Sequence, residues 1–358
     1  MTKLSTYLRG HPLALLLLAL PVTALGDYGF HWPPVALLVC AALGIVPLAA
    51  YIGEATESLA HYTGPRIGAL LNATLGNAAE LIITIVAVKA GLLELVKASI
   101  TGSILGNLLL VLGFAMVVGG VKHGAQTFNR RQAGRNAILL VLSVIAMLIP
   151  SLFSQNIGAA TSPKVEALSL GVAGVMIVLY VLGLIDTTKD SESPISRSVP
   201  ETSLPHWSTG QALLVLAAAT IGIAWLSEVL VGVAEAVIAG LGISEFFLGI
   251  ILIPVIGNVA EHLVAVQLAS KNKMELSVEI AVSSSLQVAL FVGPLLVFVS
   301  LLLGHPLQLI FNPFELFALA MGVIIAALVS ADGESTWLEG AALLAVYVIL
   351  ALAFFLLP

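Results

Sequence analysis

Long apolar segments recur along the whole of this 358-residue chain, and they restrict what it can fold into. A helix that crosses a lipid bilayer needs ~20 mostly apolar residues. The segment from Ile138 to Ile149 carries apolar residues on every face, unlike the alternating strands of a membrane β-barrel. We therefore predict an all-α polytopic membrane protein.

The pattern predicts about eleven transmembrane helices. They are 11–26, 33–60, 64–90, 94–120, 133–153, 164–185, 209–240, 245–270, 275–304, 313–331 and 336–357. The first segment is short, follows Lys3 and Arg9, and ends in small residues. It is either a retained helix or a cleavable signal peptide, and we favour the retained helix. The segments 33–60 and 209–240 are long for one crossing, so each must tilt, bend or protrude.

Charged residues are scarce. The chain has 14 Lys and Arg and 20 Asp and Glu, which make up 9% of its residues, whereas a soluble domain has about 25%. This composition excludes an ordinary cytosolic enzyme. Without a basic patch, no nucleic-acid partner is expected. The single Cys40 excludes an internal disulfide framework and a cysteine-built zinc site. The expected partners are the lipid bilayer and inorganic cations, with no cofactor.

The loops predict the orientation, because cytoplasmic loops are enriched in Lys and Arg. With the N-terminus inside and the C-terminus outside, the outer loops contain only Lys89, Lys97 and Lys164. The inner side collects Lys3, Arg9, Arg66, Lys122, Arg130, Arg131, Arg135, Lys189, Arg197, Lys271 and Lys273. The long polar stretch at 186–208 is predicted to be a flexible cytoplasmic linker. No organelle-targeting signal is evident, which favours a prokaryotic inner membrane.

Two segments of the chain resemble each other at an offset of 181 residues. Gly76-Asn77-Ala78-Ala79-Glu80 matches Gly257-Asn258-Val259-Ala260-Glu261, and Glu54 matches Glu235. Each repeat holds five predicted helices, an odd number, so the second repeat is inverted relative to the first. The predicted domains are a leading helix (1–32), a first repeat (33–185), the linker (186–208) and a second repeat (209–358). Inverted repeats are typical of transporters, whose sites lie near the bilayer midplane.

Glu80 and Glu261 lie inside predicted helices, where a charged side chain costs ~2.5–3.5 kcal/mol. We expect the two carboxylates to share a cation. The alternative is that each is protonated and only holds helices together by hydrogen bonds. Gly76-Asn77 and Gly257-Asn258 precede them, with Pro254 just before the second pair, so we expect a broken or loosened helix at each site. A broken helix exposes carbonyl oxygens that can bind a cation; otherwise the glycines only allow close packing.

The predicted cation ligands are therefore hard oxygens, which suit Ca²⁺. Ser103 and Asn107 share one helix face, and Ser283, Ser284, Ser285 and Gln287 occupy the matching part of the ninth helix. They either complete the site or pair helices. His262 adjoins Glu261 and is expected to be a hydrogen-bond partner or proton relay rather than a ligand.

Four further acids lie near helix ends. Glu54 and Glu57 belong to the second predicted helix, and Glu228 and Glu235 to the seventh. In the inverted topology they form acidic vestibules at opposite mouths, which would concentrate cations. The alternative is that they are solvated helix ends.

The paired segments Gly76–Ile82 and Gly257–His262 resemble the calcium/proton exchanger (CAX) family of the cation/calcium exchanger superfamily. Gly102-Ser103 with Gly106-Asn107, and Ser284-Ser285-Leu286-Gln287, support this resemblance. The family implies exchange of cytosolic Ca²⁺ for protons by alternating access, with Glu80 and Glu261 as the ion-binding pair. The linker has four acids and two bases, so it is unlike the strongly acidic segment of some members.

In this hypothesis, Glu80 and Glu261 bind either one Ca²⁺ or protons, and both states neutralise the site. A sodium-coupled Ca²⁺ exchanger and a cation channel remain alternatives. An enzyme is not expected, because Gly-x-Ser-x-Gly and His-Glu-x-x-His motifs are both missing from the sequence. Mn²⁺, Cd²⁺, Na⁺ or K⁺ also fit oxygen sites, so the sequence leaves selectivity open, along with the oligomeric state.

Overall fold

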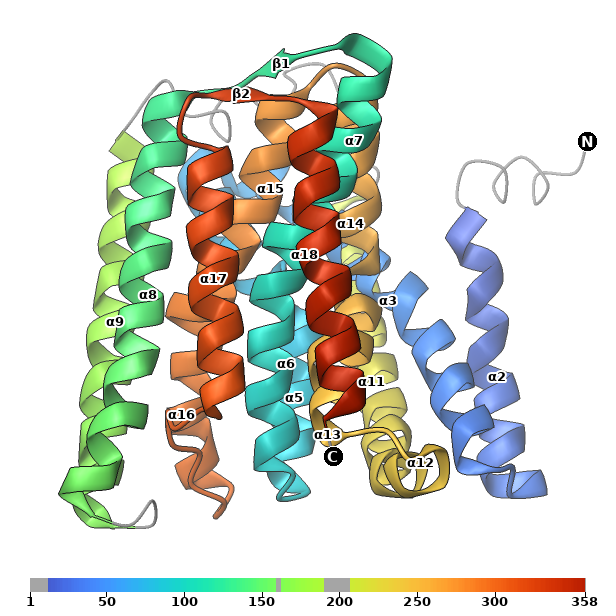
Figure 1. Cartoon of the computed structure of the whole chain (residues 1–358). Helices are drawn as coiled ribbons and strands as arrows, with labels where there is room; N and C mark the ends of the chain where they lie inside the picture. The colour runs from blue at the N-terminus through green and yellow to red at the C-terminus, as the bar shows by residue number, and fades with distance from the viewer. Residues whose placement is uncertain (1–11, 159–161, 190–206, 358) are drawn as a thin grey trace, which may run out of the picture. The chain divides into compact units, whose positions relative to one another are not determined.

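The computed structural model describes residues 12–158, 162–189 and 207–357, and almost all of them are helical (Figure 1). Most of the predicted linker, 190–206, lies outside the described residues, as do Lys3, Arg9 and Arg197. Within the described ranges, nine helical segments are long and apolar enough to cross a membrane. The protein is therefore an all-α, multi-pass membrane protein, as predicted.

The helices follow one another along the chain with short connections. Their bounds before the linker are η1 (Pro12–Leu18), α2 (Ala19–Ala24), η2 (Leu25–Phe30), α3 (Pro34–Thr63), α4 (Pro65–Leu75), α5 (Ala78–Lys89), α6 (Leu93–Leu105), η3 (Gly106–Val111), α7 (Leu112–His123), α8 (Arg130–Ile157) and α9 (Pro163–Lys189). After the linker they are α11 (Thr209–Gly232), α12 (Ala234–Leu241), α13 (Glu245–Phe247), η4 (Leu248–Leu252), α14 (Ile253–Ser270), α15 (Met274–Gln287), η5 (Val288–Val292), α16 (Gly293–Leu302), α17 (Pro313–Val329) and α18 (Trp337–Leu356).

Three of the eleven predicted spans differ from a single long helix. The segment 64–90 is divided into α4 and α5, and the segment 313–331 forms α17, which has only 17 residues. The seventh predicted span, 209–240, is likewise interrupted after Gly232, where α11 gives way to α12. The other predicted spans correspond to continuous helical segments.

By its internal contacts, the chain forms two compact units. The first comprises the described parts of Met1–Ala90, Val199–Ile243 and Ile256–Ala260. The second comprises those of Gly91–Ser198, Ser244–Val255 and Glu261–Pro358. Each unit therefore combines helices from before and after the linker. This division differs from the predicted repeats, which remain a prediction.

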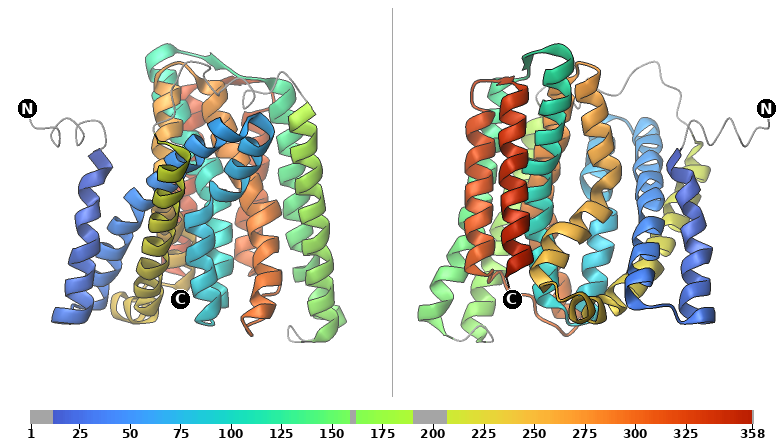
Figure 2. Two further views of the ribbon diagram at one scale, coloured as in Figure 1. Left: turned by 180° about the vertical axis from the view of Figure 1, so that it is seen from behind. Right: turned by 45° about the vertical axis from the view of Figure 1, so that its right-hand side comes forward.

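In the first unit, α11 packs along α3, and α2 lies beside α3 in both views of Figure 2. Small residues bring α3 and α11 together. A Cβ placed on Gly44 would lie 2.8 Å from Leu226, and one on Gly222 would lie 2.8 Å from Leu48. A leucine of each helix thus packs over a glycine of the other. On both helices the leucine follows the glycine by four residues.

In the second unit, α8 lies beside α9, and α7 beside α18 (Figure 1). Gly113 and Gly340 form the crossing of α7 and α18, since a Cβ on Gly340 would lie only 2.6 Å from the carbonyl oxygen of Gly113. A short antiparallel ribbon, β1 (Gln126–Thr127) with β2 (Glu334–Ser335), joins the loops after α7 and before α18.

Candidate functional site

The first repeated segment lies at a break between two helices. The N–H of Gly76 donates to the carbonyl of Asn72 at the end of α4, and Asn77 has φ −96° and ψ 23°, outside the helical range. The N–H of Leu81 then donates to the carbonyl of Asn77 as α5 begins. The helix break predicted at Gly76-Asn77 is confirmed.

The break places Glu80 in the first turn of α5, and both Glu80 and Asn77 are buried. The first turn of a helix carries a partial positive charge and several N–H groups without helical acceptors. The start of α5 therefore offsets part of the cost of burying a carboxylate there.

The second repeated segment is different, and the predicted break there is wrong. Gly257, Asn258 and Glu261 all lie within the continuous helix α14. The irregularity comes earlier, as the π-helical turn η4 just before Pro254. Pro254 occupies the first turn of α14, where its missing N–H is not needed by the helix. The proline therefore starts a regular helix instead of interrupting one.

Residues from both repeated segments meet in the first unit. A Cβ built on Gly257 would lie 3.8 Å from Cβ of Glu80 and 3.9 Å from its backbone nitrogen. Asn258 follows and is buried, and its Nδ2 has no hydrogen-bond partner among the described residues. An amide nitrogen that is buried without an acceptor is unusual in proteins.

The second unit contains a chain of polar side chains that ends on Glu261. Nδ2 of Asn107 donates to Oγ of Ser284 at 3.0 Å, and Oγ of Ser284 donates to Oε2 of Glu261 at 3.1 Å. Ser103 is buried one turn before Asn107, and Gln287 is half-buried one turn after Ser284. The structure thus gathers Asn107, Ser284 and Glu261, which the sequence had singled out separately.

Two π-helical turns lie at corresponding positions in this network. η3 begins at Gly106 and contains Asn107, and η5 begins directly after Gln287. The residues of η5, 288–292, lie 181 positions after residues 107–111 of η3. A π-turn widens a helix locally, and such turns are frequent at functional sites. Their equivalent placement agrees with the offset between the repeated segments.

His262 is half-buried next to Glu261 on α14, and its Nε2 has no hydrogen-bond partner within the described part of the chain. Among the described residues, no group of three or more His, Cys, Asp or Glu side chains gathers to hold a metal ion. The oxygen groups assembled here are carboxylates, amides and hydroxyls, the donor set that Ca²⁺ prefers.

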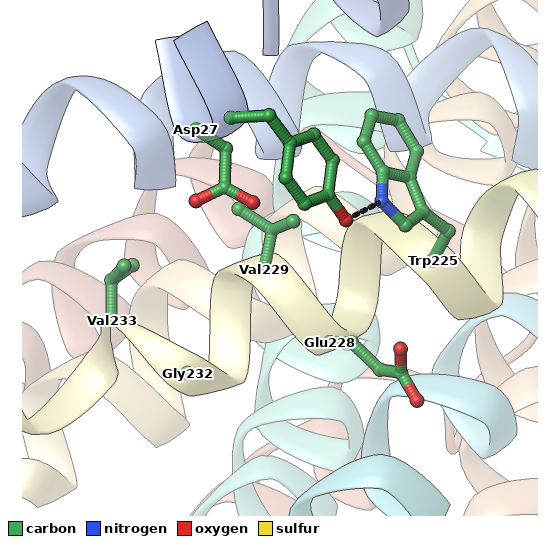
Figure 3. A pocket seen from close by; sticks show the side chains of 7 residues that line it. Asp27, Trp225, Glu228, Val229, Gly232 and Val233 are labelled. Carbon is green, nitrogen blue, oxygen red and sulfur yellow. Dashed lines mark hydrogen bonds between the residues drawn. The ribbon is translucent and has the colours of Figure 1, made fainter. Parts of the chain in front are cut away.

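The acids predicted at the mouths have different surroundings. Glu54 is half-buried and Glu57 exposed on α3, and Glu235 is exposed on α12. Glu228 lies 3.5 Å from Nζ of Lys89 and lines an open pocket of about 280 Å³ (Figure 3). The residues of this pocket are Asp27, Tyr28, Trp225, Glu228, Val229, Gly232 and Val233. Nε1 of Trp225 donates to the hydroxyl of Tyr28 at 3.2 Å. The carboxylates of Asp27, from η2, and of Glu228, from α11, lie on opposite sides of the α11 ribbon in Figure 3.

Sequence reasoning missed two carboxylates inside the second unit. Glu315 is fully buried, accepts the N–H of Asn312 at 2.9 Å and accepts the hydroxyl of Thr101 at 3.4 Å. Glu279 is half-buried and accepts a hydrogen bond from Gln132. Both acids interrupt apolar segments. Because acidic residues are rare inside such segments, their position there was the signal that could have identified them.

The family model described as sodium/calcium exchanger protein matches residues 33–187 and 211–356. The Ca²⁺/H⁺ antiporter of Aphanothece halophytica is 45% identical over 358 residues, covering 96% of each chain. The Ca²⁺/H⁺ antiporter ChaA of Bacillus subtilis (strain 168) is 45% identical over 342 residues, covering 94% of this chain and 96% of its own.

The solved structure of native YfkE is similar with a TM-score of 0.84 and 43% sequence identity. The match covers 96% of this chain and all of that one. This coverage spans most of both ranges that the family model matches. The chain therefore belongs to the sodium/calcium exchanger protein family and, within it, to the calcium/proton exchanger (CAX) branch.

Proposed function

We propose that this protein is a secondary active transporter that exchanges cytosolic Ca²⁺ for protons. The observation that carries the proposal is the polar chain from Asn107 through Ser284 to Glu261, together with the contact of Gly257 with Glu80. Two bacterial relatives at 45% identity are Ca²⁺/H⁺ antiporters, which supports the same cargo.

We assign the cation to Glu80 and Glu261, one acid from each repeated segment. Glu261 follows Gly257 by four residues on α14, so both lie on one face of that helix, one turn apart. The equivalent place of the two acids in the repeated segments supports a site shared by the two carboxylates. The further oxygen ligands in this proposal come from Asn77, Asn258, Ser103, Ser284 and Gln287, and from the backbone at Gly76 and Gly257.

The exchange follows from charge neutralisation. One Ca²⁺ or two protons cancel the charge of two carboxylates, whereas an empty, doubly charged site is costly inside a membrane. Only the loaded forms can then reorient at a reasonable rate, which couples the two fluxes. His262 can pass protons to Glu261, because it is the next residue and its Nε2 lacks a partner among the described residues.

We further propose that the protein resides in the inner membrane of a prokaryote, with a cytoplasmic N-terminus and an external C-terminus. The distribution of Lys and Arg between the loops supports this orientation. Glu54 and Glu57 would then lie toward the cytoplasmic mouth and Glu235 toward the external mouth.

The test is Ca²⁺ uptake into liposomes that contain purified protein and have an acidic interior, with Na⁺ absent and the membrane potential clamped. Uptake that disappears when the pH gradient is collapsed is expected. Uptake only with an outward Na⁺ gradient would identify a sodium-coupled exchanger, and conductance without a counter-ion would identify a channel. Competition by Mn²⁺, Cd²⁺, Na⁺ and K⁺ in the same assay measures selectivity.

A further inference from the structure

The structure contains a carboxylate on α15 that the site described above does not use. Glu279 lies five residues before Ser284 and is half-buried. Gln132 of α8, itself 9% exposed, donates from Nε2 to Oε2 of Glu279. The other carboxylate oxygen, Oε1, makes no hydrogen bond within the described residues. It can therefore interact with a passing cation.

The charged groups near Glu279 come from three helices. Arg135 of α8 lies one turn after Gln132, and its guanidinium is 3.4 Å from Oδ2 of Asp186 on α9. Glu275 lies one turn before Glu279 on α15 and is exposed. Among the described residues, Glu279 forms no direct ion pair, and Arg135 attracts its carboxylate only from a longer distance.

Glu279 belongs to a polar face of α15. Glu279, Ser283 and Gln287 are spaced by four residues and lie along the same side of the helix. All three are half-buried, whereas Val278, Ala281, Val282, Ser284 and Ser285 beside them are buried. A helix face that meets lipid is apolar, so a polar and partly exposed face is expected to meet water.

This face leads toward the ion-binding glutamate. Ser283 and Ser284 are neighbours, and Ser284 donates to Glu261. The five residues from Glu279 to Ser284 span ~7.5 Å along the helix axis. Glu279 is therefore nearer the end of α15 at Met274, which follows the basic loop of Lys271 and Lys273 and is predicted to face the cytoplasm.

We propose that Glu279 is a cation-attracting residue on the cytoplasmic access path, which raises the local Ca²⁺ concentration beside Glu261. This inference rests on the proposed function. A carboxylate on a partly exposed polar helix face attracts divalent cations and increases their rate of binding. It acts on capture of Ca²⁺ and not on the reorientation of the loaded protein, so its loss should change KM and leave kcat unchanged.

The experiment uses everted membrane vesicles, whose external face is the cytoplasmic one, and measures pH-driven Ca²⁺ uptake. Glu279→Gln removes the charge and retains a hydrogen-bonding partner for Gln132. We expect KM for Ca²⁺ to rise by roughly threefold to tenfold at low salt, with kcat preserved. The difference should shrink at high salt, since ions screen the attraction. Gln132→Ala, which keeps the carboxylate and removes its hydrogen bond, should change KM by less than about twofold.

An unchanged KM in Glu279→Gln would overturn the inference. So would equal, salt-independent losses of kcat in Glu279→Gln and Gln132→Ala, because both variants would then only loosen α8 from α15. If Glu279→Gln does not fold, Gln132→Glu provides the test. The added negative charge should lower KM at low salt, and an unchanged KM would reject the path. Failure of the unaltered protein to take up Ca²⁺ would instead refute the proposed function.

Discussion

Ser284 of α15 donates a hydrogen bond from Oγ to Oε2 of Glu261 on α14, across 3.1 Å. The same hydroxyl oxygen accepts a hydrogen bond from Asn107, so its hydrogen is directed toward the carboxylate. A hydroxyl that donates in this way stabilises the ionised form of Glu261, which is the form that binds a cation.

Replacing Ser284 by alanine should therefore weaken Ca²⁺ binding. A hydrogen bond to a charged group contributes about 1.5–3 kcal/mol, which corresponds to roughly a 10-fold to 150-fold increase in the dissociation constant. The measurement is Ca²⁺ binding to purified protein by calorimetry. Ser285→Ala is the matched control, because Ser285 is buried beside Ser284 but donates to the backbone carbonyls of Ala281 and Ile104 and not to a carboxylate. Equal affinities of the two variants would contradict this role of Ser284.

Glu80→Gln and Glu261→Gln should each abolish pH-driven Ca²⁺ uptake while the protein remains folded. Glutamine has nearly the same shape as glutamate, but one charge of the pair is lost, so Ca²⁺ is no longer neutralised. The measurement is uptake into liposomes, with elution volume in gel filtration as the check on folding. Glu166→Gln, in the first turn of α9, provides a control elsewhere in the chain. Persistent uptake in both glutamine variants would reject the proposed site.

Acidifying the side from which Ca²⁺ is loaded should raise the apparent KM for Ca²⁺. Protons and Ca²⁺ compete for the same carboxylates, and binding of the metal must release the protons. With two protons released, KM rises by up to about 100-fold for each unit of pH once protons occupy the site. Acidifying the opposite side should increase uptake instead. Initial rates over a series of pH values, with the two sides varied separately, measure both effects. A KM that is independent of loading-side pH would mean that protons bind elsewhere.

Gly102→Ala should destabilise the second unit. A Cβ at this position would lie 2.1 Å from the carbonyl oxygen of Ile250 and 2.5 Å from its Cα. Backbone cannot move aside as a side chain can, so we expect the free energy of unfolding to fall by ~3 kcal/mol. Thermal unfolding in detergent measures the change. Gly106→Ala is the control, since nothing lies within 4 Å of a Cβ there. Wild-type stability of Gly102→Ala would show that α6 does not pack closely on η4.

Glu228→Gln should leave the free energy of unfolding within about 1 kcal/mol of the original value. Its ion pair with Lys89 is formed by side chains that are 59% and 68% exposed, and exposed pairs contribute little to stability. Thermal unfolding of Glu228→Gln and Lys89→Met should therefore give similar, small shifts. A large shift in either would indicate that the pair is shielded from water.

The membrane helices and the repeated glutamates could be predicted from the sequence because both signals are local. Apolar length predicts a span, and an acid such as Glu80 inside one is rare. The form of α14 was not predictable in this way, since Pro254 can either interrupt a helix or begin one. The choice depends on the turn at η4, which packs on Gly102 far away in the chain.

The partners of buried acids were also beyond sequence reasoning. Gln132 and Glu279 are separated by 147 residues, and Thr101 and Glu315 by 214. Glu315 follows Asn312 closely enough to suggest a helix start, but its complete burial depends on α6. Such contacts are set by tertiary packing, and no pattern within either segment indicates them.

Each compact unit takes helices from both sides of the linker, and this has a consequence for biosynthesis. The first unit includes Ile256–Ala260, so the ribosome must have made more than two thirds of the chain before that unit can be completed. Helices such as α3 and α5 must therefore wait in the membrane for α11 and α14 to be inserted. The nascent protein cannot mature one half at a time, and a stop in translation after the linker leaves both units unfinished.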